Sequence, residues 1–310
     1  MKFTHESIIV DVEISSRCNA TCNYCPREDL LLGHMTSSTY QRVLERLDEM
    51  RVPPEIHICG KGDPSVHPDL VFFVEEASAR GYKVFVTSNG RLITRDVAQK
   101  LVDAGLTGIY FSVATLPDEY DDFYGLPFQA VRQNIIDFNA VAGEKCRCIV
   151  SISHRAENEN GPCKSQKKYW KALGIKEFLV IHYHNRAAIY SDMERDYYDM
   201  AYPEIRKLIH RHGLMGLCFS PFKVININWD GGYQICANDF TMKSVLGNIF
   251  DMSIRDAQIK RLDYFSQENI VCKRCNVYHR TFDSLMKDES TENVERYIDF
   301  ENLLSDLAQG

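Results

Sequence analysis

The stretch that decides the fold reads IIVDVEISSRCNATCNYC, residues 8–25, an apolar run followed at once by three cysteines. The apolar run has the length of a strand. Cys18, Cys22 and Cys25 follow it with the spacing C-x3-C-x2-C. Thiolates suit iron–sulfur clusters, and three of them on one loop hold three irons of a [4Fe–4S] cube, which leaves the fourth iron open. Zinc is the alternative, but structural zinc is closed by four protein ligands, so the spacing favours a cluster.

Strand-like and helix-like patterns alternate from the start of the chain to about residue 185. The six expected strands are Ile8–Ile14, Glu55–Cys59, Lys83–Thr87, Gly108–Val113, Cys146–Ser153 and Glu177–His182, with helices expected at 37–51, 68–80, 94–104, 127–142 and 164–173. Six β/α units in a row indicate a parallel sheet covered by helices. The expected fold class is α/β, a partial (β/α)6 barrel of the TIM type with a small C-terminal β-hairpin and helix domain.

Polar side chains recur on one face of the fifth strand. Ile149, Ser151, Ser153 and Arg155 share that face, whereas the other face carries cysteine, valine and isoleucine. A buried polar side chain is costly unless it meets a ligand or another polar group. The pattern predicts a barrel mouth that binds a polar molecule; polar contacts confined to the strand end are the alternative.

The pattern changes after residue 185. Lys223–Asn228 and Tyr233–Ile235 flank Asp230-Gly231-Gly232, which is typical of a β-hairpin. Helices are expected near 204–212, 253–265 and 291–308, and Leu246–Ile249 is interpreted as the opening of the second of these. We expect two domains, residues 1–190 and 191–310.

A second group of cysteines lies in the C-terminal part of the chain, at Cys218, Cys236, Cys272 and Cys275. Four thiolates make a closed site that suits zinc as well as iron. Cys59, Cys146 and Cys148 are interpreted as small buried apolar residues. Cys163 lies past the fifth strand near the expected barrel mouth, where a thiol can donate a hydrogen atom to a substrate radical.

Composition narrows the class of protein. The chain has 310 residues, a formal net charge of −7 and no long run of Lys or Arg, which argues against nucleic acid as the main partner. The N-terminus does not resemble a signal peptide, and no apolar stretch reaches the about 18 residues that a membrane span needs. We expect a cytoplasmic protein, in which 11 reduced cysteines are better explained by metal than by disulfides.

The three-cysteine loop resembles that of the radical S-adenosylmethionine (SAM) superfamily. Tyr24 before the last cysteine and the leading Ile14–Asn19 belong to the resemblance, as do Cys59-Gly60-Lys61-Gly62-Asp63-Pro64 and Thr87-Ser88-Asn89-Gly90. Lys61 and Asp63 depart from the usual Gly-Gly-Glu-Pro. The resemblance implies a [4Fe–4S] cluster on the first three cysteines. The residues that it implies for SAM binding are Tyr24, Gly60, Gly62, Asp63, Ser88, Asn89, Ser112, Ser153 and Arg155.

The C-terminal cysteines resemble a shortened SPASM domain, called twitch. The spacing C-x12-G-x4-C through Gly231, then Leu246–Ile249 and the C-x2-C pair, carries this resemblance. It implies that Cys218, Cys236, Cys272 and Cys275 hold a second, fully ligated [4Fe–4S] cluster that transfers electrons. The two cysteine layouts together resemble enzymes of the deoxy-scyllo-inosamine dehydrogenase type.

These resemblances imply a radical enzyme. We expect it to abstract hydrogen from a small polar substrate, a sugar, aminocyclitol or other alcohol, and to oxidise it through the auxiliary cluster, with a base near Arg155, His182 or His184. The expected reductant is a flavodoxin or ferredoxin. An epimerase that uses Cys163, an enzyme that modifies ribosomal peptides, and a zinc-stabilised binding module are the alternatives.

Overall fold

The computed structural model describes residues 8–27, 30–115, 117–154, 162–182 and 224–266. The chain forms two compact units, residues 1–183 with 223–254 and residues 184–222 with 255–310. The described part of the second unit belongs to helix α10 (Ile254–Ser266). None of the described helices is long and apolar enough to cross a bilayer.

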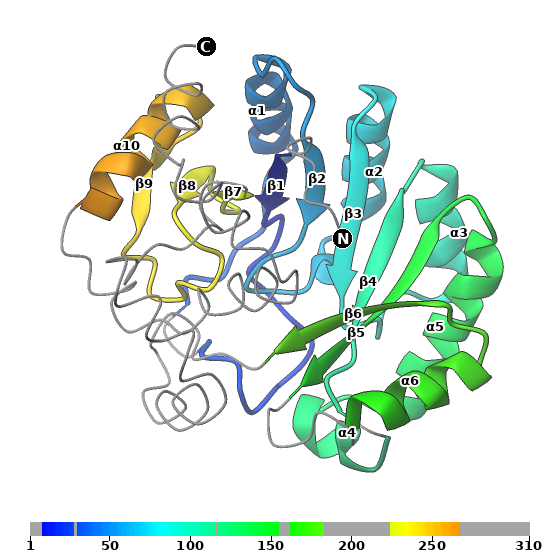
Figure 1. Ribbon diagram of the computed structural model, residues 1–310. Coiled ribbons are helices and arrows are strands. Elements are labelled where there is room, and N and C mark those ends of the chain that lie inside the picture. The colour runs from blue at the N-terminus through cyan, green and yellow to red at the C-terminus, as the bar shows by residue number, and fades with distance from the viewer. Residues whose placement is uncertain (1–7, 28–29, 116, 155–161, 183–223, 267–310) are drawn as a thin grey trace, which may run out of the picture. The chain divides into compact units, whose positions relative to one another are not determined.

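The first unit is built on one sheet, shown in Figure 1. Its parallel strands are β1 (Ile9–Val12), β2 (Glu55–Ile58), β3 (Lys83–Ser88), β4 (Gly108–Ser112), β5 (Arg147–His154) and β6 (Glu177–His182). On the other side of β1 follow β7 (Val224–Ile227), parallel to β1, and then the antiparallel β8 (Gly232–Gln234) and β9 (Val245–Asn248). The order is β6-β5-β4-β3-β2-β1-β7-β8-β9, which confirms the six expected strands and the fold class.

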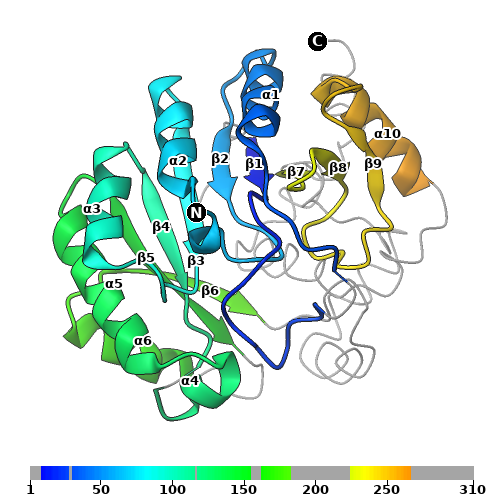
Figure 2. The same ribbon diagram turned by 180° about the vertical axis from the view of Figure 1, so that it is seen from behind.

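Helices connect the parallel strands and cover one face of the sheet, as Figure 2 shows from behind. They are α1 (Ser37–Asp48), α2 (Leu70–Ala79), α3 (Arg95–Asp103), α4 (Pro117–Tyr124), α5 (Phe128–Ala142) and α6 (Pro162–Ala172). Thr36 caps α1, because its side chain accepts a hydrogen bond from the amide of Thr39 at 3.1 Å. Five of these helices confirm the prediction. Two elements were not predicted: helix α4 and the short 3-10 turn Pro64–Val66 that precedes α2.

The two faces of the sheet differ in chemistry. The side chains that face the helices are apolar and fully buried; those of Val10, Val12, Ile56 and Ile58 have no exposed surface. Each such side chain stabilises the fold by about 1.5–3 kcal/mol. The opposite face carries polar side chains beside apolar ones such as Phe85 and Ile149: Asp11 lies in register between His57 on β2 and Asn226 on β7. We call this surface the polar face.

The hairpin of β7 and β8 confirms the prediction. The side chain of Asp230 accepts a hydrogen bond from the amide of Gly232 at 3.0 Å, and Gly231 has a φ of 84°, which favours glycine. The interpretation of Leu246–Ile249 as a helix opening was wrong. Most of this segment is β9, where Gly247 pairs with Tyr233, and the helix begins at Ile254.

The sheet continues beyond the expected domain boundary, because β7 pairs directly with β1. The division into residues 1–190 and 191–310 stays a prediction. The helices expected near 204–212 and 291–308 lie outside the described residues.

Candidate active site

The three early cysteines lie on the loop between β1 and α1. Cys18, Cys22 and Cys25 are all partly exposed. The base of the loop is closed by Ser16, whose hydroxyl accepts a hydrogen bond from the amide of Gly33 at 2.8 Å and donates to the carbonyl of Leu31 at 3.0 Å. These two hydrogen bonds hold the start of the loop against its end.

Helix α4 holds the middle of this loop, a role that the sequence did not indicate. The amide of Thr21 donates to the carbonyl of Tyr124 at 2.9 Å, and the amide of Asn23 donates to that of Phe123 at 3.3 Å. The ring of Tyr24 stacks on Phe123 with 4.8 Å between centroids. These contacts fix the backbone on both sides of Cys22.

The sulfur of Cys18 has the surroundings of a thiolate ligand. It accepts hydrogen bonds from the amide of Ala20 at 3.4 Å and from the side-chain amide of Asn89 at 3.8 Å. Burial raises the pKa of the Cys18 thiol, and binding to a metal overcomes such a shift because it deprotonates the thiol. Among the described residues no three His, Cys, Asp or Glu side chains gather around a point for one metal ion.

Asp63 ties together the ends of β2 and β3. One carboxylate oxygen accepts from the amide of Ser65 at 2.9 Å and the hydroxyl of Ser88 at 2.9 Å. The other accepts from the amide of Asn89 at 2.6 Å. The carboxylate is thus engaged with protein donors. The structure describes a positioning role for Asp63 and Ser88, and their contact with SAM stays a prediction.

Gly62 packs directly on the cysteine loop. A Cβ atom at this position would overlap the carbonyl oxygens of Ser15 and Arg17, and the amide of Asp63 donates to the carbonyl of Arg17 at 2.8 Å. At Gly60 a Cβ would meet the side chain of Glu13. Both glycines are therefore required for the close approach of the two segments.

The other predicted SAM ligands lie on β4 and β5. Ser112 pairs in register with Ser151, whose buried hydroxyl has no hydrogen-bond partner among the described residues. Ser153 lies two residues farther along β5. Arg155 and His184 lie outside the described residues, and the side chains of Ser153, Cys163 on α6 and His182 at the end of β6 are not described. Their roles stay predictions.

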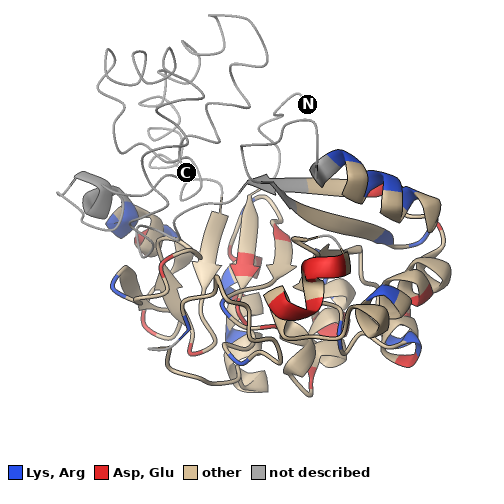
Figure 3. Cartoon of the chain, turned by 90° about the horizontal axis from the view of Figure 1, so that it is seen from below, with Lys and Arg blue, Asp and Glu red and all other residues tan. Residues whose placement is uncertain are grey.

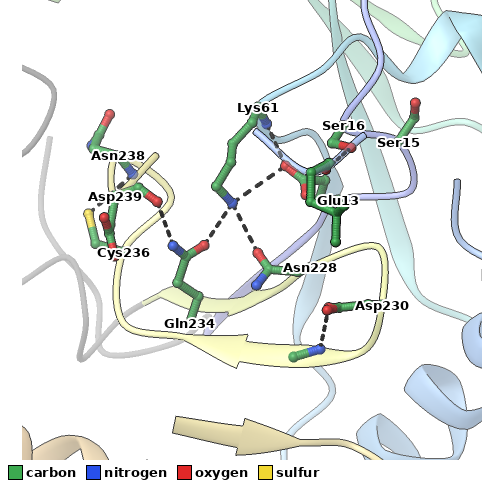
Figure 4. Close-up of polar contacts among 12 residues, drawn as sticks. Glu13, Ser15, Ser16, Lys61, Asn228, Asp230, Gln234, Cys236, Asn238 and Asp239 are labelled. Carbon is green, nitrogen blue, oxygen red and sulfur yellow. Dashed lines mark hydrogen bonds and ion pairs between the residues drawn. The ribbon is translucent and has the colours of Figure 1, made fainter. Parts of the chain in front are cut away.

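Of the four cysteines predicted to hold the auxiliary cluster, Cys236 lies within the described residues; Cys218, Cys272 and Cys275 lie outside them. It follows β8, and its sulfur accepts a hydrogen bond from the amide of Asn238 at 3.3 Å. Burial raises the pKa of the Cys236 thiol. Figure 4 shows that a polar network leads from this turn to Lys61, next to the Gly62 that packs on the first cysteine loop.

Two ionisable side chains on the polar face, Asp11 and His57, have a pKa shifted by burial. Burial raises the pKa of Asp11 to about 7, although the Cys59 thiol donates a hydrogen bond to it. Cys59 therefore has a polar partner, whereas Cys146 and Cys148 are buried as predicted. Burial also lowers the pKa of His57.

Helix α4 also sets the charge beside the cysteine loop. It carries four acidic residues, which Figure 3 colours red: Asp118, Glu119, Asp121 and Asp122. A negative surface disfavours the phosphate backbone of a nucleic acid at this edge.

Two family models match the chain. The model described as the radical SAM superfamily matches residues 12–159, and the SPASM model, an iron–sulfur cluster-binding domain, matches residues 218–276. Together they favour iron–sulfur clusters over zinc at both cysteine groups.

Curated relatives match part of the chain. Over 108 residues it is 31% identical to the tungsten-containing aldehyde ferredoxin oxidoreductase cofactor-modifying protein of Pyrococcus furiosus, covering 34% of this chain and 30% of that protein. It is 34% identical to a PqqA peptide cyclase of Bradyrhizobium diazoefficiens over 108 residues, 34% of this chain and 28% of the other. The matched stretch thus spans less than a third of the length of these two relatives.

Solved structures share the fold over most of the chain. A crystal structure of BtrN in complex with AdoMet and 2-DOIA has a TM-score of 0.57 and 18% identity, covering 87% of this chain and 93% of that one. SuiB of Streptococcus suis bound to the precursor peptide SuiA has a TM-score of 0.62 and 14% identity, covering 86% and 66%.

Proposed function

We propose, on the premise that this chain is a radical SAM enzyme with an auxiliary iron–sulfur domain, that it oxidises a small polar substrate: a sugar, an aminocyclitol or another alcohol. Its cofactors are SAM and two [4Fe–4S] clusters. When bound, the first cluster and SAM supply a 5′-deoxyadenosyl radical, which takes a hydrogen atom from a substrate C–H bond. Cys218, Cys236, Cys272 and Cys275 would hold the auxiliary cluster, which would take up the electron that the substrate radical gives up as a base removes its proton, leaving a carbonyl. A flavodoxin or ferredoxin supplies the electron that starts the reaction.

The observation that carries this proposal is the unsatisfied polarity of the polar face. Four buried atoms on it have no hydrogen-bond partner among the described residues: Glu13 Oε1, His57 Nε2, Asn226 Oδ1 and Ser151 Oγ. Each unpartnered buried group costs about 1–3 kcal/mol. A substrate that carries several hydroxyl or amino groups relieves this cost, whereas an apolar one does not.

The position of the β7–β8 hairpin supports oxidation as the outcome of the reaction. Strand β7, which leads into the hairpin with Cys236, is the direct neighbour of β1, which leads into the loop with Cys18. The segment with Cys236, which would help to hold the electron acceptor, and the loop with Cys18, which would help to hold the radical source, therefore follow strands of the same sheet. The fold shared with BtrN, solved with AdoMet and 2-DOIA, supports the same assignment.

The base that accepts the substrate proton is proposed near Arg155, His182 or His184, which follow β5 and end or follow β6; of these three, the histidines can take up a proton, because a guanidinium stays protonated. The carboxyl ends of parallel strands are where barrel enzymes gather their catalytic groups. Arg155 and Ser153 are also proposed to hold the carboxylate and ribose of SAM, because an arginine forks onto a carboxylate through two hydrogen bonds.

An anaerobic assay tests the proposal. Protein reconstituted with iron and sulfide should bind about eight irons per chain. With SAM, a strong reductant and candidate alcohols, it should form 5′-deoxyadenosine and a product lighter by two hydrogens. Cys18→Ala should abolish both, and Cys272→Ala with Cys275→Ala should spare cleavage of SAM but lower oxidation. Oxidation at an unchanged rate in the latter variant would remove the auxiliary cluster from the reaction.

Peptide modification is the second candidate, since SuiB, solved with its precursor peptide, shares the fold. A peptide substrate would be consumed while small alcohols are not. An epimerase would leave the substrate mass unchanged, take up deuterium from solvent and stop in Cys163→Ala, whereas a dehydrogenase would tolerate that change.

A further inference from the structure

Lys61 occupies an unusual place for a lysine. It lies between Gly60 and Gly62 in the segment after β2 that packs on the first cysteine loop, yet its side chain is only 3% exposed. Its backbone amide donates a hydrogen bond to Glu13 at 2.6 Å. A lysine is almost never fully buried unless it is paired.

The ammonium of Lys61 reaches the hairpin of β7 and β8 (Figure 4). It donates to the side-chain oxygen of Gln234 at 2.7 Å and to that of Asn228 at 3.0 Å, and lies 3.5 Å from the Glu13 carboxylate. An ammonium has three donors, and each has a partner here. The ion pair with Glu13 offsets the cost of burying the charge.

Gln234 connects Lys61 to the turn that carries Cys236, because it forms hydrogen bonds with both. Because its oxygen accepts from Lys61, its amide nitrogen faces Asp239 and donates to the carbonyl of that residue at 2.6 Å. The amide of Asp239 donates to the carbonyl of Cys236 at 3.1 Å, and the Asp239 carboxylate accepts from Ser244 at 2.7 Å. The turn is thus fixed at both ends and tied through Gln234 to Lys61.

We propose that Lys61 is a positioning residue that links the segment after β2, which packs on the first cysteine loop, to the turn carrying Cys236, and so fixes the place of this one expected ligand of the auxiliary cluster. This inference rests on the proposed function. Its geometric part, the placement of the Cys236 turn by Lys61, does not depend on which substrate is oxidised.

The test compares variants of the full, reconstituted chain. Lys61→Met removes the link but leaves Glu13 buried without a partner charge. The pair Lys61→Met with Glu13→Gln is therefore the decisive variant, because it is neutral and the glutamine still accepts from the amide of residue 61. It is compared with Glu13→Gln alone, because Glu13 also lies on the polar face where the substrate is proposed to bind. Lys83→Met, at an exposed lysine paired with Glu55, is the matched control.

Two readouts are measured. The first is the yield of oxidised product per 5′-deoxyadenosine formed, which isolates the electron-accepting step from cleavage of SAM. The second is the electron paramagnetic resonance spectrum of the reduced auxiliary cluster, recorded in a background with Cys18, Cys22 and Cys25 replaced by alanine. The spectrum needs no substrate, so it tests Lys61 even if no candidate alcohol is oxidised.

We expect the yield to fall about tenfold or more in both Lys61 variants, since small displacements of a reacting group have effects of this size. We expect the spectrum to change in both and to stay unchanged in the Lys83 control. Loss of the auxiliary iron with the first cluster retained also supports the link. An unchanged yield and spectrum in the neutral pair overturns it, even if Lys61→Met alone is impaired, because the effect would then come from the unpaired Glu13.

Discussion

Replacing Asp11 by asparagine should make the protein more stable at high pH and leave its stability nearly unchanged at low pH. Burial raises the pKa of Asp11 from 3.8 to about 7, so the folded protein binds the Asp11 proton more tightly than the unfolded chain does. Stability therefore falls as pH rises from about 4 to about 7 and is constant above that. Asparagine cannot ionise, and its side-chain oxygen still accepts the hydrogen bond from Cys59.

The size of the effect follows from the shift in the pKa of Asp11. One pKa unit corresponds to about 1.4 kcal/mol, so ionised Asp11 costs at most about 4 kcal/mol. Asp11 is partly exposed, which makes this figure an upper limit. Between pH 5.5 and pH 8.5 the advantage of the variant should grow by about 2 kcal/mol, because part of the cost is already present at pH 5.5.

Urea unfolding under nitrogen, followed by circular dichroism, measures this advantage at the two pH values. Asp96→Asn on α3, an exposed aspartate paired with Lys100, is the control for the loss of a negative charge. If the stability difference between Asp11→Asn and the parent protein is the same at pH 5.5 and pH 8.5, Asp11 is not a desolvated carboxyl that ionises near neutrality. The assignment of the polar face as a desolvated site then fails with it.

Three further changes test the cysteine loop and its supports. Gly62→Ala should prevent assembly of the first cluster, because the added methyl group overlaps the carbonyl of Arg17; iron analysis should find about four irons in place of about eight. Asp63→Asn keeps the shape but weakens its acceptor for the amide of Asn89, so we expect a loss of about 1–3 kcal/mol in urea unfolding and a KM for SAM raised about tenfold. Tyr24→Ala should release the loop from Phe123 and lower the yield of 5′-deoxyadenosine, because the stacked ring contact is lost.

The sequence predicted the parallel part of the sheet because its strands are short apolar runs bounded by turn residues. It did not predict α4, in which only Tyr120 and Tyr124 are buried, so a two-turn helix shows little apolar period. Nor did it predict β9, four residues with a glycine among them, which is a strand because β8 pairs with it. In both cases tertiary contacts decide the structure and local preference does not.

The candidate site also has a part that the sequence could predict and a part that it could not. The spacing of Cys18, Cys22 and Cys25 was sufficient to predict a cluster, because the three lie on one loop. The link from Lys61 was out of reach, since its partners Asn228 and Gln234 lie 167 and 173 residues away in the sequence. They come near only because β7 pairs with β1, and no property of the lysine itself indicates that pairing.

On the polar face, side chains that lower the stability of the fold indicate a functional site. A strand position between His57 and Asn226 would be more stable with an apolar residue than with Asp11, whose ionised form costs up to about 4 kcal/mol. That is a large part of the 5–15 kcal/mol by which a typical domain is stable. A fold gains nothing from keeping that carboxylate and the unpartnered Ser151 hydroxyl in one sheet. A bound polar substrate gains from both, so the positions that weaken the empty protein are those we expect to hold the reacting molecule.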